Sequence, residues 1–515
     1  MVANKSDGNA SPTFESLVLL LTVFVVGLCT IVYELLIGSV SSYFLGDSIK
    51  QFSITIGLTM TAMGIGTLLS RTIRKNLMHW FILVELALGL IGGLSVPFLF
   101  VAYSWTDLYY PVMISLITVI GILIGLEIPL LTRIMERHYS LRANISNVLS
   151  LDYFGAFAAT LLFPFLLLPF LGIFRSSLVT GSINLLIGVF NLWYFRTYLG
   201  LSKKWGLKYC TAGAAALLIG LFLGSQTLMN AWENAVYEDR VILSRQSSYQ
   251  KIVLTKNRAD VRLYLDGHLQ FSTIDEYRYH EALVHVPLSL VKTRERILIL
   301  GGGDGLAARE VLKYAGVKYV TIVDLDPDIT DLARSNPMIV KANMNSLGDG
   351  RVIVKNMDAF KFLEEAIEYY DVILADLPDP RDTSLARLYS REFFRLAAKR
   401  LSRQGVFVTQ STSPFFAKKA FWCIKETIGS ANFKQVVPYH VYVPSFGDWG
   451  FVMAANIKRD LSRLSVSVPT RYLDDENLKA MFLFSKDLRT DGVKVSSLNE
   501  PNVLSYYLEG WKHWN

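Results

Sequence analysis

The stretch that decides the fold is Arg296–Asp324, RILILGGGDGLAAREVLKYAGVKYVTIVD. Its first five residues form an apolar run of buried-strand length that leads directly into the glycine-rich loop 301–305. A helical pattern follows over 306–313, and a second apolar run ends in Asp324. A strand, a helix and a second strand in this order predict a βαβ unit, and therefore a parallel, doubly wound sheet.

The glycine-rich loop predicts a nucleotide-like ligand. Glycines let the chain turn tightly and let a ligand approach the backbone. Asp324, at the end of the second strand, is placed to accept hydrogen bonds from ribose hydroxyls. NAD enzymes and AdoMet enzymes both use this arrangement. Asp304 inside the loop disfavours a pyrophosphate and favours a cationic ligand, such as a sulfonium with an amine tail.

Two later strand runs, 351–354 and 370–375, also end close to carboxylates. Ligands of such sheets bind beyond the carboxyl ends of the strands, so these acids are expected to share one crevice. Acids around one cleft repel each other unless the ligand is strongly cationic. The five acids are Asp304, Asp324, Asp358, Asp376 and Asp379.

The chain around this unit divides into a membrane half and a soluble half. Of its 515 residues, 52% are hydrophobic and only 18% are charged, which excludes a wholly soluble or a disordered protein. The apolar excess lies before residue 231, and residues 249–271 alternate apolar and polar in a β-hairpin pattern. The predicted domains are a polar tail (1–15), a transmembrane domain (16–230), a β-rich subdomain (231–290), a Rossmann-like catalytic domain (291–460) and a C-terminal tail packing on it (461–515).

The membrane half is predicted to be an α-helical bundle of seven spans, each of about 20 residues or more. The expected spans are 16–38, 51–72, 79–105, 109–135, 147–171, 174–195 and 208–230. Four carboxylates lie inside or at the edge of these spans: Glu34, Glu85, Glu127 and Asp152. They could hold a cation or a polyamine, or they could be protonated carboxyls bonded across helices.

The net charge of +7 does not point to nucleic acid, because much of the surplus of Lys and Arg lies in short loops between spans. The positive-inside rule places the N-terminus in the cytoplasm, and seven spans then place the soluble half outside. The three cysteines offer neither a disulfide framework nor zinc-ligand spacing. We therefore predict a multi-pass protein of the cell (inner) membrane, with the side of the catalytic domain left open.

Several motifs of the soluble half occur in the order seen in spermidine synthases. They are Tyr249-Gln250, Leu265–Gln270 (LDGHLQ), Asp275-Glu276, Tyr279–Glu281, Gly301–Gly305, Arg309-Glu310 and Asp376-x-x-Asp379-Pro380. The chain therefore resembles the polyamine aminopropyltransferases over roughly residues 240–455, in a form with a membrane-embedded N-terminal domain. A resemblance of residues 16–230 to the multi-span region fused to such synthases is much less specific.

The resemblance implies transfer of the aminopropyl group of decarboxylated AdoMet to an amine, with putrescine as the first candidate, giving spermidine and methylthioadenosine. It implies no cofactor or metal besides that co-substrate, a polyamine and a lipid bilayer as partners, no nucleic acid, and a homo-oligomer (dimer or higher). By resemblance, Asp376 is the base, Gln250 and Asp304 contact the aminopropyl part of decarboxylated AdoMet, Asp324 binds the ribose hydroxyls, and Asp358 and Ala359 bind the adenine. The resemblance also assigns the amine acceptor to Asp379 and Tyr279, with His280 in the wall of that site. Glu276 is a further candidate, because the charged second amine of a diamine needs an anionic partner. Decarboxylated AdoMet is made inside cells, which favours a cytoplasmic active site against the charge rule.

The sequence departs from the family pattern at four places. Asp324 stands where soluble members usually carry Glu, and the shorter acid should still reach the ribose. Leu377 and Pro378 lie between the paired acids, and Arg381-Asp382 replaces a following x-Gly. These two changes put the lid and the choice of acceptor in doubt. The family's late Tyr aligns with Val443, so we expect Asp448 or Trp449 to form that wall of the site.

The chemistry itself requires a base. A primary amine is protonated in water, with a pKa near 10 as for Lys, and must lose a proton before it attacks the carbon next to a sulfonium. A positioned carboxylate such as Asp376 meets this need. Two alternatives stay open. One is an AdoMet-dependent methyltransferase, which Asp304 disfavours because it would face the carboxylate of AdoMet. The other is a membrane polyamine carrier or sensor, which the intact Asp376 disfavours.

Overall fold

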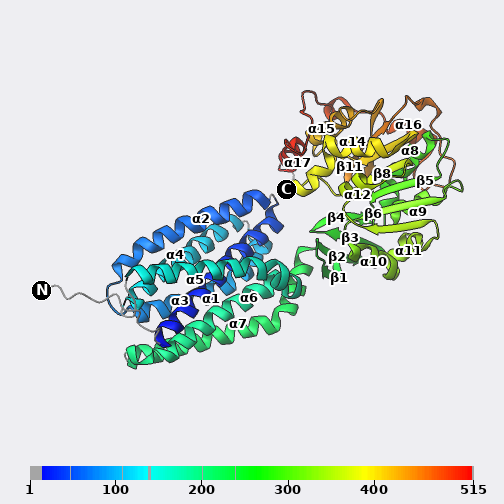
Figure 1. The fold of residues 1–515 in the computed structure, drawn as a ribbon. Helices are drawn as coiled ribbons and strands as arrows, with labels where there is room; N and C mark the ends of the chain where they lie inside the picture. The colour runs from blue at the N-terminus through cyan, green and yellow to red at the C-terminus, as the bar shows by residue number, and fades with distance from the viewer. Residues whose placement is uncertain are drawn as a thin grey trace. The chain divides into compact units, whose positions relative to one another are not determined.

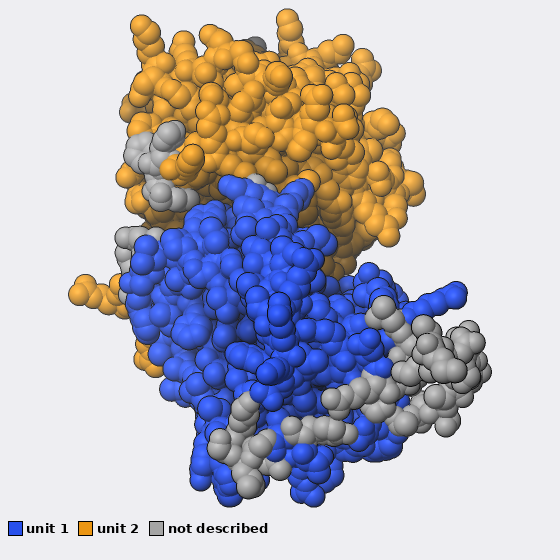
Figure 2. Space-filling model, turned by 90° about the vertical axis from the view of Figure 1, so that its left-hand side faces the viewer, with its two compact units in different colours: residues 1–238 blue, residues 239–515 orange. Residues whose placement is uncertain are grey.

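The computed structural model describes residues 14–46, 48–106, 108–136, 141–199, 201–237 and 239–512. Residues 1–13 of the predicted polar tail and Trp514 lie outside this set. The chain divides into two compact units, Met1–Glu238 and Asp239–Asn515 (Figure 2). Each unit is described by itself below.

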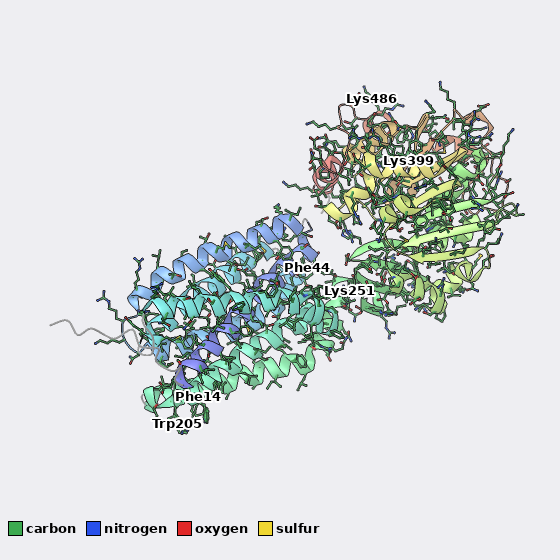
Figure 3. All side chains as sticks on the ribbon, in the orientation of Figure 1. Phe14, Phe44, Trp205, Lys251, Lys399 and Lys486 are labelled. Carbon is green, nitrogen blue, oxygen red and sulfur yellow. The ribbon has the colours of Figure 1, made fainter. Side chains whose placement is uncertain are left out.

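The N-terminal unit is a bundle of long helices (Figure 1). The helices are α1 (Phe14–Leu45), α2 (Ser48–Leu69), α3 (Leu77–Trp105), α4 (Tyr109–Met135), α5 (Leu141–Leu162), α6 (Leu168–Tyr194) and α7 (Leu201–Val236). Large apolar side chains such as Phe14 and Trp205 are exposed on this unit (Figure 3). Apolar side chains on the outside of a bundle are compatible with a lipid surround.

The structure has six apolar helical stretches of spanning length among the described residues, whereas the sequence predicted seven. The difference lies in Arg142–Tyr194, a stretch of 53 residues that contains two predicted spans, 147–171 and 174–195. An unbroken helix of that length would measure about 80 Å, far more than the roughly 30 Å of a bilayer core. Gly172, with φ +70° and ψ 174°, interrupts the helical geometry between the two predicted spans.

Small residues let these helices approach each other closely. A Cβ on Gly125 of α4 would lie 2.1 Å from the carbonyl oxygen of Met63 in α2. A Cβ on Gly155 of α5 would lie 2.1 Å from the carbonyl oxygen of Phe24 in α1. Gly181 of α6 meets the backbone of α3 in the same way. Backbone contact of this kind is typical of helices that pack without a large hydrophobic driving force.

The C-terminal unit begins with a four-stranded antiparallel sheet in the order β1-β2-β3-β4. Its strands are β1 (Arg240–Gln246), β2 (Lys251–Asn257), β3 (Asp260–Leu265) and β4 (His268–Ser272). The β3–β4 turn places Asp266 at φ +49° and Gly267 at φ +81°, which are the positive values expected of a tight hairpin turn. The predicted hairpin is therefore present, within a larger sheet.

The second sheet has seven strands in the order β10-β11-β9-β8-β5-β6-β7. The parallel strands are β5 (Arg296–Gly301), β6 (Tyr319–Asp324), β7 (Val352–Asn356), β8 (Tyr370–Asp376) and β9 (Leu401–Gln410). The antiparallel edge consists of β10 (Gln435–Val443) and β11 (Gly447–Ala455). The predicted Rossmann-like sheet is confirmed.

Helices cover both faces of this sheet. Accordingly, alternate residues of β5 belong to two different hydrophobic cores. Ile297 and Ile299 pack in one core with the long helix α8 (Glu276–Leu290), whereas Leu298 and Leu300 pack in the other with α14 (Arg391–Arg400). The remaining helices are α9 (Leu306–Val311), α10 (Pro327–Ser335), α11 (Pro337–Ala342), α12 (Ala359–Glu365), α13 (Thr383–Ala386), α15 (Lys418–Gly429), α16 (Asp475–Ala480) and α17 (Asn502–Trp511). The last of these, α17, packs on α15 and on the loop after β9.

Candidate active site

Four of the predicted acids lie at the carboxyl edge of the parallel sheet. Asp324 and Asp376 are the last residues of β6 and β8, Asp304 follows β5, and Asp358 follows β7. The register pairs Gly301 with Asp376 directly across β5 and β8. Because parallel strands all end at the same edge, the chain brings these carboxylates to one crevice.

The loop between β5 and α9 is shaped by its glycines. Gly301 and Gly302 have φ of +80° and +62°, and a Cβ on Gly301 would lie 1.9 Å from the carbonyl oxygen of Asp376. The Gly303 N–H donates to Asp324 Oδ2 at 3.0 Å, and the Leu306 N–H donates to Asp304 Oδ1 at 2.8 Å. A residue with a Cβ could not occupy position 301, because the Cβ would collide with the carbonyl oxygen of Asp376.

Among the residues that the structure describes, Asp376 has one side-chain hydrogen-bond partner, Tyr279 of α8. The phenol donates to Asp376 Oδ1 at 2.6 Å, and Tyr279 is only 7% exposed. A Cβ on Gly302 would lie 3.3 Å from the other oxygen, Oδ2, which shows how closely the glycine loop approaches this carboxylate. The sequence placed Tyr279 with Asp379 against the amine, but the structure places its hydroxyl on Asp376.

Asp379 lies in a polar niche built by residues far away in sequence. Gln410 Nε2 donates to Asp379 Oδ1 at 3.2 Å, and Thr412 Oγ1 donates to Asp379 Oδ2 at 3.3 Å. Tyr507 of α17 also hydrogen bonds to this carboxylate. Thr412 has φ +56°, and a β-branched residue in this region costs about 1–3 kcal/mol. The surrounding structure therefore holds Thr412 in this conformation against the backbone preference of a β-branched residue.

Glu276 does not face the crevice as a free carboxylate, which corrects its expected place beside the amine. Arg309 binds both of its oxygens, Nη1 to Oε1 at 2.8 Å and Nη2 to Oε2 at 2.9 Å. The ring of His280 lies 2.9 Å from Glu276 Oε2, and both side chains are buried. Glu276 thus fixes His280 and Arg309, because a buried carboxylate needs charged or hydrogen-bonding partners.

His280 carries a positive charge beside the acids. Burial alone would lower its pKa, but the hydrogen bond and charge of Glu276, with the charges of Asp304 and Asp376, raise the pKa to about 9. Burial raises the pKa of Asp304, Asp324 and Asp379 to about 6 each. Desolvated carboxylates with raised pKa values are typical of a binding site for a cation.

The remaining predicted residues, Gln250, Asp358 and Ala359, lie near the carboxyl ends of β6 and β7. Gln250 Nε2 donates to Asp326 Oδ2 at 3.0 Å, and Asp326 caps α10, so Gln250 lies beside the end of β6. Asp358 accepts from the Lys361 N–H at 3.0 Å as the cap of α12 and forms an ion pair with Arg387. The buried Ala359 begins that helix.

The departures from the family pattern have visible consequences. Arg381 forms an ion pair with Asp266 at 2.9 Å and so ties the loop after β8 to the β3–β4 turn. Asp448 lies 2.6 Å from the ring of His440 rather than standing free as a wall of the site. The Trp449 ring packs against Phe446 in a tilted arrangement, with 5.2 Å between ring centroids, and the Phe446 centroid lies 6.2 Å from that of Tyr279. Of the two expected replacements, Trp449 is the one in the aromatic group next to Tyr279.

Three residues of the site were missed by the sequence reasoning. Gln410 ends β9, so the strand-end rule that selected the acids would also have selected this amide. Thr412 follows two residues later. Tyr507 carries no local signal, because it reaches the site through the packing of α17 and not through a motif.

Comparison with known proteins identifies the family. Residues 276–463 match the family described as "Spermine/spermidine synthase domain". The polyamine aminopropyltransferase of Oceanobacillus iheyensis is 42% identical over 95% of this chain and 96% of its own length. That of Leptospira interrogans is 40% identical over 96% of this chain and 98% of its own length. These matches extend across the helical unit as well as the catalytic unit.

Among solved structures, a spermidine synthase in complex with the transition state analogue AdoDATO is 26% identical, with a TM-score of 0.44, and the match covers 48% of this chain and 85% of that one. The sequence matches are long and specific, and they agree with the acid-lined crevice at the carboxyl edge of the sheet. The chain therefore belongs to the polyamine aminopropyltransferases and is a transferase of the spermidine synthase family.

Proposed function

We propose that this enzyme transfers the aminopropyl group of decarboxylated AdoMet to putrescine, giving spermidine and methylthioadenosine. The amine lone pair attacks the aminopropyl carbon bound to sulfur, the carbon–sulfur bond breaks, and its electrons stay on sulfur. The leaving thioether is neutral and needs no acid, whereas the nitrogen must lose one proton. In this proposal Asp376 takes that proton.

The observation that carries the proposal is the Tyr279–Asp376 hydrogen bond at 2.6 Å, at the point where β8 meets the glycine loop. A hydrogen bond to a charged group contributes about 1.5–3 kcal/mol and fixes the carboxylate in one orientation. The free oxygen, Oδ2, is then directed toward the loop, where Gly302 leaves room. A base with one oxygen held and the other available suits proton removal from a bound amine.

The other acids divide between the two substrates. Asp304 and Asp324 flank the glycine loop, so we assign them the aminopropyl tail and the ribose of decarboxylated AdoMet, with Asp358 and Ala359 beside the adenine and Gln250 at the aminopropyl side. Asp379, in its niche of Gln410 and Thr412, is assigned the distal ammonium of the diamine. His280 moderates the repulsion among Asp304, Asp376 and Glu276, since its charge lies among them.

Mass spectrometry of the reaction products tests this function. Detergent-purified enzyme is incubated with putrescine and decarboxylated AdoMet, and a parallel sample contains AdoMet. We expect spermidine and methylthioadenosine in the first sample only. A methylated amine in the AdoMet sample would replace the proposal with a methyltransferase. Polyamine binding without any product would replace it with a carrier or sensor.

We further propose that the N-terminal unit spans the cell membrane. Six apolar stretches of spanning length and a surface rich in exposed aromatic and aliphatic side chains support this. The protein should stay in the membrane fraction after alkaline washing and leave it only in detergent. Release by alkali alone would contradict the proposal. A reporter fused to the C-terminus then identifies the side on which the catalytic unit lies.

A further inference from the structure

Two carboxyl groups lie in the interior of the helical unit and have no role in aminopropyl transfer. Glu85 of α3 is 0% exposed and Glu127 of α4 is 1% exposed. Within the described residues neither forms an ion pair, and no donor reaches any of their four oxygens. The arginines Arg133 and Arg175 donate to backbone carbonyls and to Ser225 and Gln226 instead.

The neighbours of this pair are also polar and also lack partners. Asn184 of α6 donates its Nδ2 to the backbone oxygen of Glu85 at 3.4 Å, while its own Oδ1 has no donor in the described part of the chain. A Cβ on Gly188, one turn later, would lie 3.4 Å from Glu85 Cβ, so α6 packs closely on α3 at Glu85. The hydroxyl of Tyr33 is buried, interacts electrostatically with both glutamates and has no hydrogen-bond partner there either.

The helices α3 and α4 pack on each other, and each of the two carboxyl groups acts on the other more strongly than any other charged group in the described part of the chain does. Two ionised carboxylates cannot hydrogen bond, because each of them only accepts. A single proton between them supplies the donor and removes one buried charge at the same time. Leaving both groups ionised inside a bilayer-spanning bundle would cost several kcal/mol.

We propose that Glu85 and Glu127 form a proton-binding site that holds one exchangeable proton between α3 and α4. A proton needs no cavity, and this interior is packed through close helix contacts, as at Gly92, where a Cβ would lie 2.4 Å from the Tyr33 ring. The other titratable groups acting on the pair are Cys29 and Tyr33 of α1 and Asp152 of α5. The site is independent of the chemistry proposed at Asp376.

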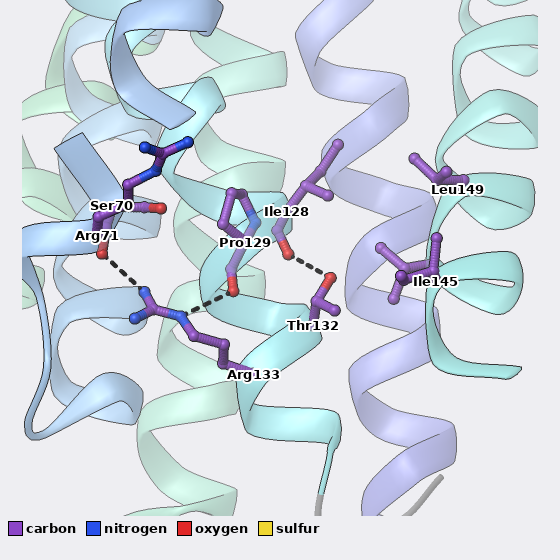
Figure 4. A pocket seen from close by; sticks show the side chains of 9 residues that line it. Ser70, Arg71, Ile128, Pro129, Thr132, Arg133, Ile145 and Leu149 are labelled. Atoms are coloured by element: carbon purple, nitrogen blue, oxygen red, sulfur yellow. Dashed lines mark hydrogen bonds between the residues drawn. The ribbon is translucent and has the colours of Figure 1, made fainter. Parts of the chain in front are cut away.

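An open cavity of about 430 Å³ lies beside the segment of α4 that follows Glu127. It is lined by Ile128 and Pro129, the residues that follow Glu127, and by Val148 of α5. Figure 4 shows Arg133 on this cavity, donating to the carbonyl groups of Ser70 and Pro129. The positive charges of Arg133 and Arg71 at this cavity disfavour entry of a polyamine and are compatible with exchange of a proton through water.

Infrared difference spectroscopy of the full-length protein in nanodiscs tests the site. The wild type should show the carbonyl band of a protonated carboxyl near neutral pH and lose it when the sample is titrated with alkali. In Glu85→Gln and Glu127→Gln, the amide donates to the remaining carboxylate in place of the proton, so this band should disappear. Glu136→Gln, an exposed residue just after α4, is the matched control and should retain it.

Persistence of the band in both Gln variants, or its absence from the wild type at every pH, would overturn the proposal. Loss of the wild-type band when spermidine is added at constant pH would also overturn it, in favour of an ammonium ion as the ligand. The wild-type titration needs no variant, so a poorly folding variant does not prevent the test. Both Gln variants should keep full aminopropyltransferase activity, which separates this proposal from the proposed function.

Discussion

Replacing Asp379 with Asn should weaken the binding of the amine far more than it slows the reaction. In our assignment this carboxylate holds the distal ammonium, which stays charged throughout the transfer. Its oxygens accept from Gln410 at 3.2 Å and Thr412 at 3.3 Å, and an amide can keep at most part of this pattern. Truncating one partner of a hydrogen-bonded charge pair costs about 2–5 kcal/mol, which corresponds to roughly a 30- to 5,000-fold increase in KM for putrescine.

The pH dependence sharpens this prediction. Burial raises the pKa of Asp379 to about 6, although hydrogen bonds from Gln410, Tyr507 and Thr412 oppose the rise. The carboxylate is therefore charged above about pH 6 and becomes neutral below it. In the wild type, KM for putrescine should rise about tenfold for each pH unit below 6. In Asp379→Asn that dependence should vanish, whereas KM for decarboxylated AdoMet should still rise in acid, because the pKa values of Asp304 and Asp324 are also about 6.

Initial rates measured at varied putrescine and saturating decarboxylated AdoMet provide the assay. Asp382→Asn is the matched control, because Asp382 lies three residues away and caps α13 by accepting from the Leu385 N–H at 2.9 Å. That variant should change KM by no more than a few-fold. An unchanged KM in Asp379→Asn, or a loss confined to kcat, would refute the assignment of Asp379 to the distal ammonium.

Three further variants test the surroundings of the site. Tyr279→Phe removes the donor to Asp376 and should lower kcat/KM about 10- to 100-fold without loss of folding; an unchanged value would mean that the 2.6 Å bond does not orient the base. Tyr507→Phe should raise KM for putrescine about five- to tenfold, since one donor in the niche is lost; an effect on decarboxylated AdoMet instead would contradict the niche. Glu276→Gln removes the buried charge that His280 and Arg309 share, leaving Arg309 with Glu310 alone, and should lower the free energy of unfolding by about 3–5 kcal/mol, measured by urea denaturation of the detergent-solubilised protein; a loss below about 1 kcal/mol would show that the Glu276–Arg309 pair is dispensable.

The sequence predicted the acids of the crevice because their positions depend on local signals. Asp324 and Asp376 each end an apolar strand run, and parallel strands deliver their ends to one edge whatever the rest of the chain does. The same rule would have selected Gln410 at the end of β9. The prediction considered only charged residues at these strand ends and therefore omitted Gln410.

Partners that meet only through tertiary packing could not be predicted in this way. Glu276 was expected to face an amine, but Arg309 from another helix binds both of its oxygens. Tyr507 reaches Asp379 because α17 packs tightly: a Cβ on Gly510 would lie 2.7 Å from Ala417 Cα. Such contacts depend on how distant elements pack, and no spacing in the sequence encodes them.

In the membrane half, the sequence located the apolar segments but not their backbone geometry. Its apolar runs were easily located, but the number of separate helices depends on one backbone conformation at Gly172. The apolar pattern placed the boundary between the predicted spans 147–171 and 174–195 around Gly172, but hydropathy measures length and polarity and does not report the backbone conformation there. Glu85 and Glu127 were easily located in the sequence, because charged residues interrupt apolar runs. That the two act on each other became visible only in the structure.

The most direct test of the central claim is a single-turnover measurement on Asp376→Asn, with decarboxylated AdoMet bound before putrescine is added. Spermidine should form about 10²- to 10⁴-fold more slowly than in the wild type, because the amine has no base to take its proton. The affinity for methylthioadenosine should stay within a few-fold, since Asp304 and Asp324 remain in place. Transfer at the wild-type rate in this variant would contradict the account, because another group would then have to remove the proton.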